Sequence, residues 1–570
     1  MAAPGGKFFI QDALSTPAKH HESFEALWKT KWEQPSKLGL YPFMFNAHED
    51  FVPIAERLIK EGQKEPYDWD KYAEAFVPKA EELLAEAENA EKAGDKAKAS
   101  EYYMRASAVY RISRFPAPRS EKQRHAWSEG KKAAQKGLLL RERPTKEVLI
   151  PHKHGLEHEG KHIPVYYHLP PGISADKPAP LVIILTGLDG YRTELAVWIE
   201  GWSQKGVAVM ILEIPGTGDS PADPSDPTSP DRAFSSLFDW IDAQAEIDQT
   251  RKALWAFSTG GYYAIRVAYT HPKRLSGVVS LGGGCHYMFD KEWLSYVNHL
   301  EYPFDLATTL AYKFGYGDDL EKFKKEAMKF SLLEDGTLDK PMCARLLLVN
   351  GVNDEIFPID DYYLALQHGP PKEARFVADR KHMGEPESFF IILKWIYNLF
   401  GLEGNPADQM KTIPSKYGRR NDWRAYHSTF HPRHQHQHNH KFIVLAKMDT
   451  DEDLDIDPDI AAAMGFGGFG SQIKGKRKFD SNDGFIGGKA SSVTGANSTP
   501  MREPKSVKVA TGSEKSEYLQ RGTTLVPYDP KTQESPNLES LKYGVRNTTG
   551  DMVYFLPSFL EDPWAGLKAK

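Results

Sequence analysis

Three residues of types that serve in nucleophilic catalysis follow short apolar runs of the chain. Ser258 follows LWAF, Asp354 follows RLLLVNGVN, and His382 lies in ADRKHMGEP. A serine hydroxyl becomes a good nucleophile when a histidine takes its proton, and an aspartate holds that imidazole in the required tautomer. Reactive groups of a parallel sheet gather at the carboxyl ends of its strands. We therefore predict that Ser258, Asp354 and His382 form a catalytic triad.

The stretch LWAFSTGGYYAIR, residues 254–266, reads as a strand, a sharp turn and a helix with Ser258 at the corner. Such nucleophile elbows usually carry the pattern G-x-S-x-G. Gly260 fits the second glycine, whereas Ala256 replaces the first and adds one methyl group, which we expect the turn to tolerate. A serine at this kind of turn is more often a helix cap. The chain order Ser, Asp, His, together with a glycine-containing loop upstream, favours the catalytic interpretation.

That upstream loop is LTGLDGYR, residues 185–192, and it predicts an oxyanion hole. One donor is expected to be the backbone N–H of Thr259, the residue after the nucleophile. Gly187 lets the chain turn, and the N–H of Leu188 is the expected second donor. Asp189 remains an alternative to Leu188.

The elements needed to position these residues are visible as five buried, β-branched or leucine-rich runs that alternate with helical patterns. Near-continuous apolar strands separated by helices indicate a parallel sheet covered on both faces. With the order of the three candidate residues, this predicts an α/β-hydrolase fold over residues 146–402, with an antiparallel hairpin at its edge. The expected strands are 179–186, 207–216, 252–258, 275–283 and 343–351.

Two helical regions accompany the sheet in this interpretation. Residues 1–145 carry helical periodicity, including an αα-hairpin broken at Gly94 and Asp95, and are predicted to form a cap domain. A second helical, aromatic-rich segment, roughly residues 285–335, is inserted between two strands. Both are expected to cover the end of the sheet that carries the candidate triad.

Residues 403–570 have a different texture, rich in Gly, Ser, Pro, Asn and Lys, and are predicted to be mostly disordered. A histidine-rich tract at 427–440 is a weak metal-binding candidate, and KGKRK at 474–478 is a candidate import or nucleic-acid patch. A solvated linker and an incidental basic run are the favoured interpretations. The last piece, MVYFLPSFLEDPWAGL, is apolar enough to dock on a partner that the sequence does not specify.

Bulk composition excludes several classes of protein. The 570 residues carry a formal charge of −6, which gives no case for wholesale nucleic-acid binding. Apolar runs are too short to span a bilayer, and the N-terminus lacks the features of a secretory signal. Only two cysteines occur, so a disulfide framework is excluded. We expect a cytoplasmic or vesicle-associated enzyme that needs no metal and no cofactor, with homodimer formation left open.

Several motifs together resemble one family. VYRISRFP, LTGLDGYR, EIPGTGDSPADPSDPTSPDR, GGYYAIR, GCHY and EYPF are similar to the fungal yellowish-green-type hydrolases that shorten polyketides in dihydroxynaphthalene-melanin synthesis. The resemblance covers residues 20–400 or so. More distant relatives include a bacterial diketone-cleaving hydrolase of nicotine breakdown and fermentation-respiration-switch-type esterases. Chains of the fungal family end near the equivalent of residue 400, so the tail suggests a fusion or a merged gene prediction.

The resemblance implies a reaction and a substrate. Family members hydrolyse a carbon–carbon bond next to a ketone in a heptaketide naphthopyrone or an acetylated hexaketide. The products are 1,3,6,8-tetrahydroxynaphthalene and acetoacetate or acetate. The family's serine, aspartate and histidine carry over to Ser258, Asp354 and His382. A flat aromatic polyketide substrate requires an apolar pocket, and the candidate polar or stacking contacts, each equally compatible with a structural role, are Asp189, Arg192, His286 and Tyr287.

Two other functions remain open from the sequence. A carboxylesterase would use the same triad on short acyl esters. A noncatalytic binding or scaffold protein would keep the fold and use the tail for a partner, although the intact triad argues against it.

Overall fold

The protein is described by a computed structural model that covers residues 8–10, 14, 16–413, 545–546 and 552–553. The chain divides into two units, Met1–Ile473 and Lys474–Lys570. In the second unit the described residues form one antiparallel pair, β9 (Val545–Arg546) with β10 (Met552–Val553). The histidine-rich tract, the basic run and nearly all of the C-terminal apolar segment lie outside the described residues, as does most of the tail for which disorder was predicted.

An eight-stranded sheet forms the centre of the first unit, in the order β1-β2-β4-β3-β5-β6-β7-β8. The strands β1 and β2 pair antiparallel, β2 pairs antiparallel with β4, and the remaining neighbours are parallel. This mostly parallel sheet with helices confirms the predicted α/β-hydrolase fold. The strands are β1 (Lys146–Pro151), β2 (His162–His168), β3 (Ala179–Leu185), β4 (Ala208–Leu212), β5 (Ile247–Phe257), β6 (Gly277–Leu281), β7 (Leu346–Gly351) and β8 (Glu373–Val377).

Both faces of the sheet are buried, which is why its central strands read as unbroken apolar runs. Along β3, Leu181 and Ile183 join the hydrophobic cluster that contains helices α10 (Ser229–Asp242) and α11 (Gly260–Thr270). Val182 and Ile184 join the cluster on the opposite face, with α9 (Ile199–Gln204) and α16 (Glu387–Phe400). Successive side chains of a strand point to opposite faces, so one strand serves both clusters.

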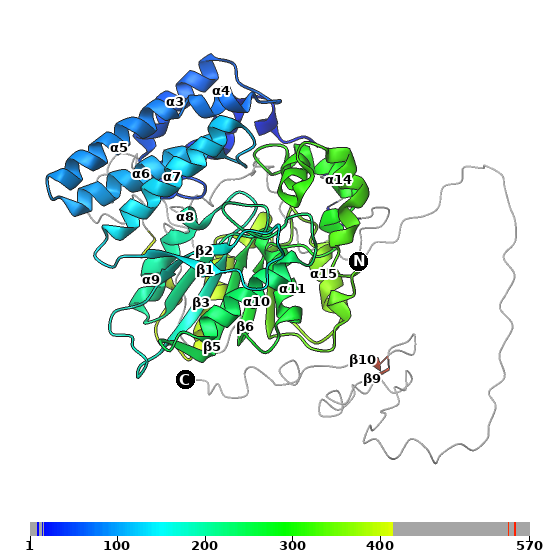
Figure 1. The fold of residues 1–570 in the computed structure, drawn as a ribbon. Helices are drawn as coiled ribbons and strands as arrows, with labels where there is room; N and C mark the ends of the chain where they lie inside the picture. The colour runs from blue at the N-terminus through cyan, green and yellow to red at the C-terminus, as the bar shows by residue number, and fades with distance from the viewer. Residues whose placement is uncertain (1–7, 11–13, 15, 414–544, 547–551, 554–570) are drawn as a thin grey trace, which may run out of the picture. The chain divides into compact units, whose positions relative to one another are not determined.

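The N-terminal helices gather beside the body that holds the sheet, as the blue and cyan ribbons of Figure 1 show. The expected αα-hairpin is present, because α5 ends at Lys92 and α6 begins at Lys96, where Asp95 caps the helix by accepting from the Lys98 N–H. Val109 and Ile112 of α6 belong to the same hydrophobic cluster as the sheet residues Leu181 and Ile183. The helices and the sheet therefore share one core. The main N-terminal helices are α3 (His48–Lys60), α4 (Trp69–Glu74), α5 (Val77–Lys92), α6 (Lys96–Arg114) and α7 (Glu121–Leu139).

Short helices make up the insert between β6 and β7 and the approach to α3. In the insert they are η5 (Tyr287–Phe289), α12 (Lys291–Tyr296), η6 (Val297–His299), α13 (Leu306–Ala311), η7 (Tyr312–Tyr316), α14 (Leu320–Glu326), η8 (Ala327–Phe330) and η9 (Thr337–Asp339). Before α3 they are η2 (Lys19–His21), α1 (Phe24–Leu27), η3 (Trp28–Trp32) and α2 (Glu33–Leu38). The others are α8 (Arg192–Leu195), η4 (Ala196–Trp198), α15 (Asp360–Gln367) and η10 (His382–Gly384).

The described residues continue past residue 402, beyond which the sequence analysis predicted a mostly disordered tail. A further helix, α17 (Pro406–Met410), packs against α9 and α16. Gln409 and Met410 are buried, and Ile413 contacts the same hydrophobic cluster. These few apolar side chains follow a glycine-rich break, so composition alone concealed their contribution to the core.

Candidate active site

Ser258, His382 and Asp354 lie in one hydrogen-bonded row at the carboxyl ends of β5, β8 and β7. His382 Nε2 is 2.8 Å from Ser258 Oγ, and His382 Nδ1 is 2.8 Å from Asp354 Oδ2. With Nδ1–H donating to the carboxylate, Nε2 is left to accept the serine proton. The side chain of Asp354 is fully buried and that of His382 is 8% exposed, whereas Ser258 is only partly buried. The three sequence candidates are thus brought together in the order that proton transfer requires.

The turn at Ser258 is an elbow between β5 and α11. Ser258 has φ +52°, a left-handed conformation that is uncommon for a residue with a side chain. Gly260 lies so close to β3 that a Cβ atom there would overlap the carbonyl oxygen of Thr186. Ala256 is buried within β5, where it pairs with Leu185 and Ser280 in regular register. The left-handed backbone is confined to Ser258 and the close approach to Gly260, so the methyl group of Ala256 is accommodated in an ordinary strand position.

Two backbone amides are available beside the serine. Among the described residues, the N–H groups of Thr259 and Leu188 donate no hydrogen bond to another protein group. The Asp189 amide instead acts on its own carboxyl group, where it opposes the rise in pKa that burial causes. Leu188 is therefore the better second donor of the two that the sequence left open. Gly187 sits against the elbow, where a Cβ would lie 3.2 Å from Phe257 O.

Asp354 is held by a set of donors that the sequence did not reveal as functional. Its Oδ1 accepts from the amides of Ile356 and Phe357 at 2.7 and 3.1 Å. Its Oδ2 accepts from Asn350 Nδ2 at 2.7 Å, in addition to the bond with His382. Asn350 Oδ1 also accepts from the Met383 amide, next to the histidine. A polar residue inside the apolar run of β7 was the available signal for this positioning role.

The electrostatic surroundings of His382 include two glutamates that sequence reasoning missed. Burial alone would lower the pKa of His382, but the adjacent Asp354 charge and hydrogen bond, with help from Glu301 and Glu385, raise it above its usual value. The His382 amide also lies 3.4 Å from Glu301 Oε2. Burial raises the pKa of Glu385 to about 7, and the Glu301 charge adds to this. The neighbouring carboxyl groups therefore stabilise the protonated form of His382.

We expect Glu385→Gln to extend activity to lower pH. Above pH 7 or so Glu385 is charged and raises the pKa of His382, so the base gains its proton sooner as the pH falls. The glutamine is neutral throughout, so the acid limb of kcat/KM, which reports the free-enzyme base, should move to lower pH. The measurement is the pH profile of kcat/KM, with Glu373→Gln on β8 as the control. An acid limb that stays in place or moves upward would contradict this coupling.

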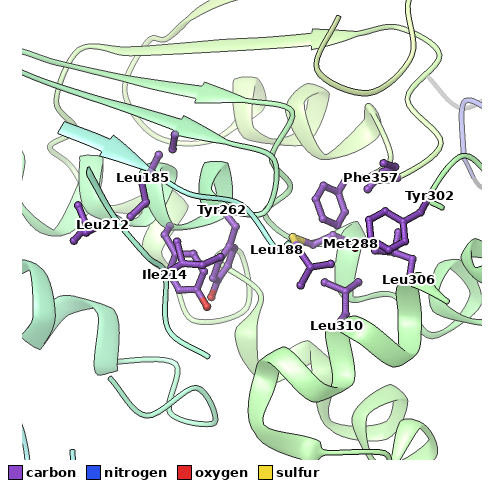
Figure 2. Packing of buried hydrophobic residues seen from close by; sticks show 14 of the residues in the cluster. Leu185, Leu188, Leu212, Ile214, Tyr262, Met288, Tyr302, Leu306, Leu310 and Phe357 are labelled. Carbon is purple, nitrogen blue, oxygen red and sulfur yellow. The ribbon is translucent and has the colours of Figure 1, made fainter. Parts of the chain in front are cut away.

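An apolar wall lies next to the oxyanion loop. Figure 2 shows Leu188 close to Met288 and Leu310, with Leu306, Tyr302 and Phe357 on the neighbouring side. All six belong to the buried hydrophobic cluster of that face, and the Phe357 ring lies 5.8 Å from the His382 ring. Five of the six side chains carry no polar group. These side chains form buried apolar packing next to the oxyanion loop.

Asp189, a candidate substrate contact, has its hydrogen-bonding groups engaged within the protein. Its carboxylate accepts from Tyr41 at 2.5 Å and from Tyr302 at 2.7 Å, and its carbonyl oxygen accepts from Arg114. Burial raises the pKa of Asp189, while the two tyrosine bonds oppose that shift. The residue next to Leu188 is thus fixed jointly by the N-terminal segment, α6 and the insert.

Arg192 was also proposed as a substrate contact, and the structure places it elsewhere. Its side chain is fully buried and pairs with Glu213, Glu147 and Asp219 at 2.8, 2.5 and 2.7 Å. The guanidinium is surrounded by these carboxylates and holds the start of α8 in place, so it does not line an open pocket. Of the two roles that the sequence left open for Arg192, the contacts favour the structural one, because its acidic partners come from β1 and from the loop after β4.

His286 and Tyr287 lie at the start of the insert and are half-buried. Their backbone amides donate to the buried carboxylate of Asp361 at 2.6 and 2.8 Å. The His286 ring contacts Ser331 Oγ through Nδ1 at 2.7 Å. These bonds anchor the insert beside β6, and the Tyr287 ring packs against the rings of Phe8 and His286.

No three His, Cys, Asp or Glu side chains in the described part of the chain are placed to share a metal ion. Within those same residues, no helix combines the length and apolar character needed to cross a membrane.

The sheet order, the elbow after β5, the acid after β7 and the histidine after β8 together define an α/β hydrolase. A family model described as Esterase FrsA-like matches residues 77–375. The chain therefore belongs to the FrsA-like esterase family. The matched region includes the elbow and Asp354 and ends shortly before His382.

Individual relatives are more distant. The chain is 27% identical to Esterase FrsA of Photobacterium profundum over 229 residues, which cover 39% of this chain and about half, 49%, of that protein. It is 27% identical to Hydrolase LUC6 of Fusarium sp over 356 residues, covering 56% and 81%. Among solved structures, 2,6-dihydroxy-pseudo-oxynicotine hydrolase is 20% identical with a TM-score of 0.49, covering 63% of this chain and 95% of that chain.

Proposed function

We propose that the protein is a serine hydrolase that cleaves a carbon–carbon bond next to a ketone in an acylated polyhydroxynaphthalene or naphthopyrone, as a step of dihydroxynaphthalene-melanin synthesis. The observation that carries the hydrolase part is the row of Ser258, His382 and Asp354 with two 2.8 Å contacts. The narrower substrate rests on the motif resemblance and on the apolar wall beside Leu188.

The mechanism follows from the order of the contacts. His382 removes the proton of Ser258, whose oxygen attacks the side-chain ketone, and the amides of Thr259 and Leu188 stabilise the resulting oxyanion. Collapse breaks the bond between the carbonyl carbon and the aromatic ring, and the ring carbon takes the proton that His382 carries. Water, activated by the neutral His382, then hydrolyses the acyl-serine to release acetoacetate or acetate.

A carboxylesterase is the second candidate, and membership of the FrsA-like esterase family favours it. The same triad would then attack an ester, and the leaving group would be an alcohol oxygen instead of a ring carbon. The two functions differ in the leaving group that His382 must protonate, so substrate choice separates them.

The deciding experiment incubates the full chain with the heptaketide naphthopyrone, an acetylated hexaketide naphthol and a short-chain nitrophenyl ester, in water enriched in ¹⁸O. We expect 1,3,6,8-tetrahydroxynaphthalene by mass spectrometry, and a released acid that carries one ¹⁸O atom because water resolves the acyl-enzyme. Ester hydrolysis without cleavage of either naphthol substrate would overturn the carbon–carbon assignment in favour of the esterase.

A further inference from the structure

A second candidate binding site lies between the N-terminal helices and the insert. A cavity of about 180 Å³ is lined by six residues that matter to its chemistry: Glu65, Tyr67, Trp69, Arg119, Phe304 and Asp305. They come from the segment before α4, the start of α4, the segment before α7 and the segment before α13. None of them belongs to the triad or the oxyanion loop.

Arg119 supplies unused hydrogen-bond donors at this cavity. Its Nε and Nη2 atoms are inaccessible to solvent and have no hydrogen-bond partner among the described residues. Its guanidinium carbon lies 4.7 Å from the centre of the Trp69 ring, which fixes the plane of the group over an aromatic face. Buried donors without partners are rare in proteins, and a ligand is one of the groups that satisfies them.

Two carboxyl groups provide acceptors at the same cavity. Burial and then the negative charge of the neighbouring Glu65 raise the pKa of Asp305. Glu65 Oε1 also lies 3.1 Å from His21 Nδ1, which orients it. The opposite charge of Arg119 acts against the shift at Asp305. A ligand here meets a hydrogen-bond donor, Arg119, and two carboxyl groups, Glu65 and Asp305, that can act as acceptors.

Aromatic rings form the remaining wall. The ring centres of Tyr67, Trp69 and Phe304 lie 5.2 to 5.4 Å from one another, and Phe304 stands nearly perpendicular to the other two. The arrangement leaves ring faces and edges for a flat guest. An engineered protein cavity of about 150 Å³ is known to bind benzene, so this volume suits a single substituted ring.

We propose that this cavity binds a small, neutral, hydroxylated aromatic ring at a site separate from Ser258. A ring oxygen accepts from Arg119, a ring hydroxyl donates to the Glu65–Asp305 pair, and the ring packs against Trp69 and Phe304. The paired carboxyl groups disfavour an aromatic carboxylate. This inference does not depend on the proposed reaction, because it concerns residues outside the triad.

The site has a structural link to the oxyanion loop. Tyr302, two residues before Phe304, donates to the carboxylate of Asp189, which adjoins Leu188. Arg119 also lies near enough to Tyr302 to affect its pKa. An occupant would thus sit against the segment that positions one of the two oxyanion donors.

The test is calorimetric titration of the full chain with resorcinol. It uses the Ser258→Ala variant, so that turnover cannot contribute. We expect one resorcinol per chain, and Arg119→Met in the same background should weaken binding about 10-fold or more through loss of a charged hydrogen bond. Arg143→Met removes a similar charge at a surface pair with Glu200 and should leave the affinity unchanged. Arg119→Lys, which keeps the charge but not the planar fork, covers the case in which Arg119→Met does not fold.

Toluene and benzoate complete the design, and both should bind more weakly than resorcinol. Toluene binding as tight as that of resorcinol would overturn the polar recognition, and tighter benzoate binding would overturn the preference for a neutral ring. A titration with no resorcinol binding, or with an affinity unchanged in both Arg119 variants, would overturn the site itself. Binding that disappears when a phosphonate blocks Ser258 in the wild-type chain would place the ligand in the catalytic pocket instead. A wild-type chain that cleaves none of the naphthol substrates but still binds resorcinol would support this site while overturning the proposed function.

Discussion

Ser258→Ala should lower kcat on the enzyme's substrate on the order of 10⁶-fold, the scale seen when a serine hydrolase loses its nucleophile. The hydroxyl is 2.8 Å from His382 Nε2, and no other described side-chain oxygen is hydrogen-bonded to that nitrogen. The loss should appear in kcat more than in KM, because the apolar wall beside Leu188 is untouched. Product formation followed by mass spectrometry gives the measurement.

The matched control for that variant is Ser276→Ala. Ser276 lies just before β6, at the amino ends of the parallel strands, whereas Ser258 lies at their carboxyl ends. Its hydroxyl donates to Thr250 O. Its replacement should leave kcat within a small factor of the wild type. Turnover by Ser258→Ala at the wild-type rate, with the fold verified by its melting temperature, would rule out the serine mechanism.

Arg192→Met should destabilise the protein by roughly 3–5 kcal/mol, because it leaves the buried carboxylate of Glu213 without its cation. Glu213 is nearly fully buried, and its carboxylate accepts from Arg192 Nη1 at 2.8 and 2.9 Å and from the Arg192 backbone amide at 3.1 Å. We expect a lower midpoint of thermal unfolding, whereas a substrate-binding residue would chiefly raise KM. Thermal unfolding and steady-state kinetics on the same preparations distinguish the two roles.

Lys131→Met is the control within the same cluster. Lys131 pairs with Asp219 at 2.8 Å, but both side chains are about one quarter exposed. Partly exposed pairs contribute little to stability, so the melting temperature should barely change. An Arg192→Met protein that melts like the wild type, with only KM altered, would restore the original substrate-contact prediction.

The architecture was predictable because each buried parallel strand is visible in the sequence as a short apolar run. The strands β3 and β4 are apolar over nearly their whole length, and β5, β6 and β7 each contain an apolar run that ends at a glycine or polar turn. The candidate triad was also accessible, since each member directly follows such a run or lies in the loop after β8. Strand order then brings together residues as far apart as Ser258 and His382.

What the sequence concealed depends on contacts between distant segments. Asn350, Glu301 and Glu385 act on the candidate site only through the way β7, the insert and the β8 loop converge. Arg192 follows a glycine loop and so resembles a site residue, although its side chain is buried and paired with carboxylates from β1 and the loop after β4. A local pattern indicates that a residue is near a strand end but not which charges will surround it.

The convergence on Asp189 bears on how such proteins can recombine. Its carboxylate is held by Tyr41 from the N-terminal segment and Tyr302 from the insert, and its carbonyl by Arg114 of α6. A cap transplanted from another hydrolase would bring none of these donors in register, and Leu188 would lose its fixed neighbour. The cap and the sheet are therefore expected to evolve together. New substrate preferences are expected to arise by point substitution within the cap rather than by exchange of the whole cap.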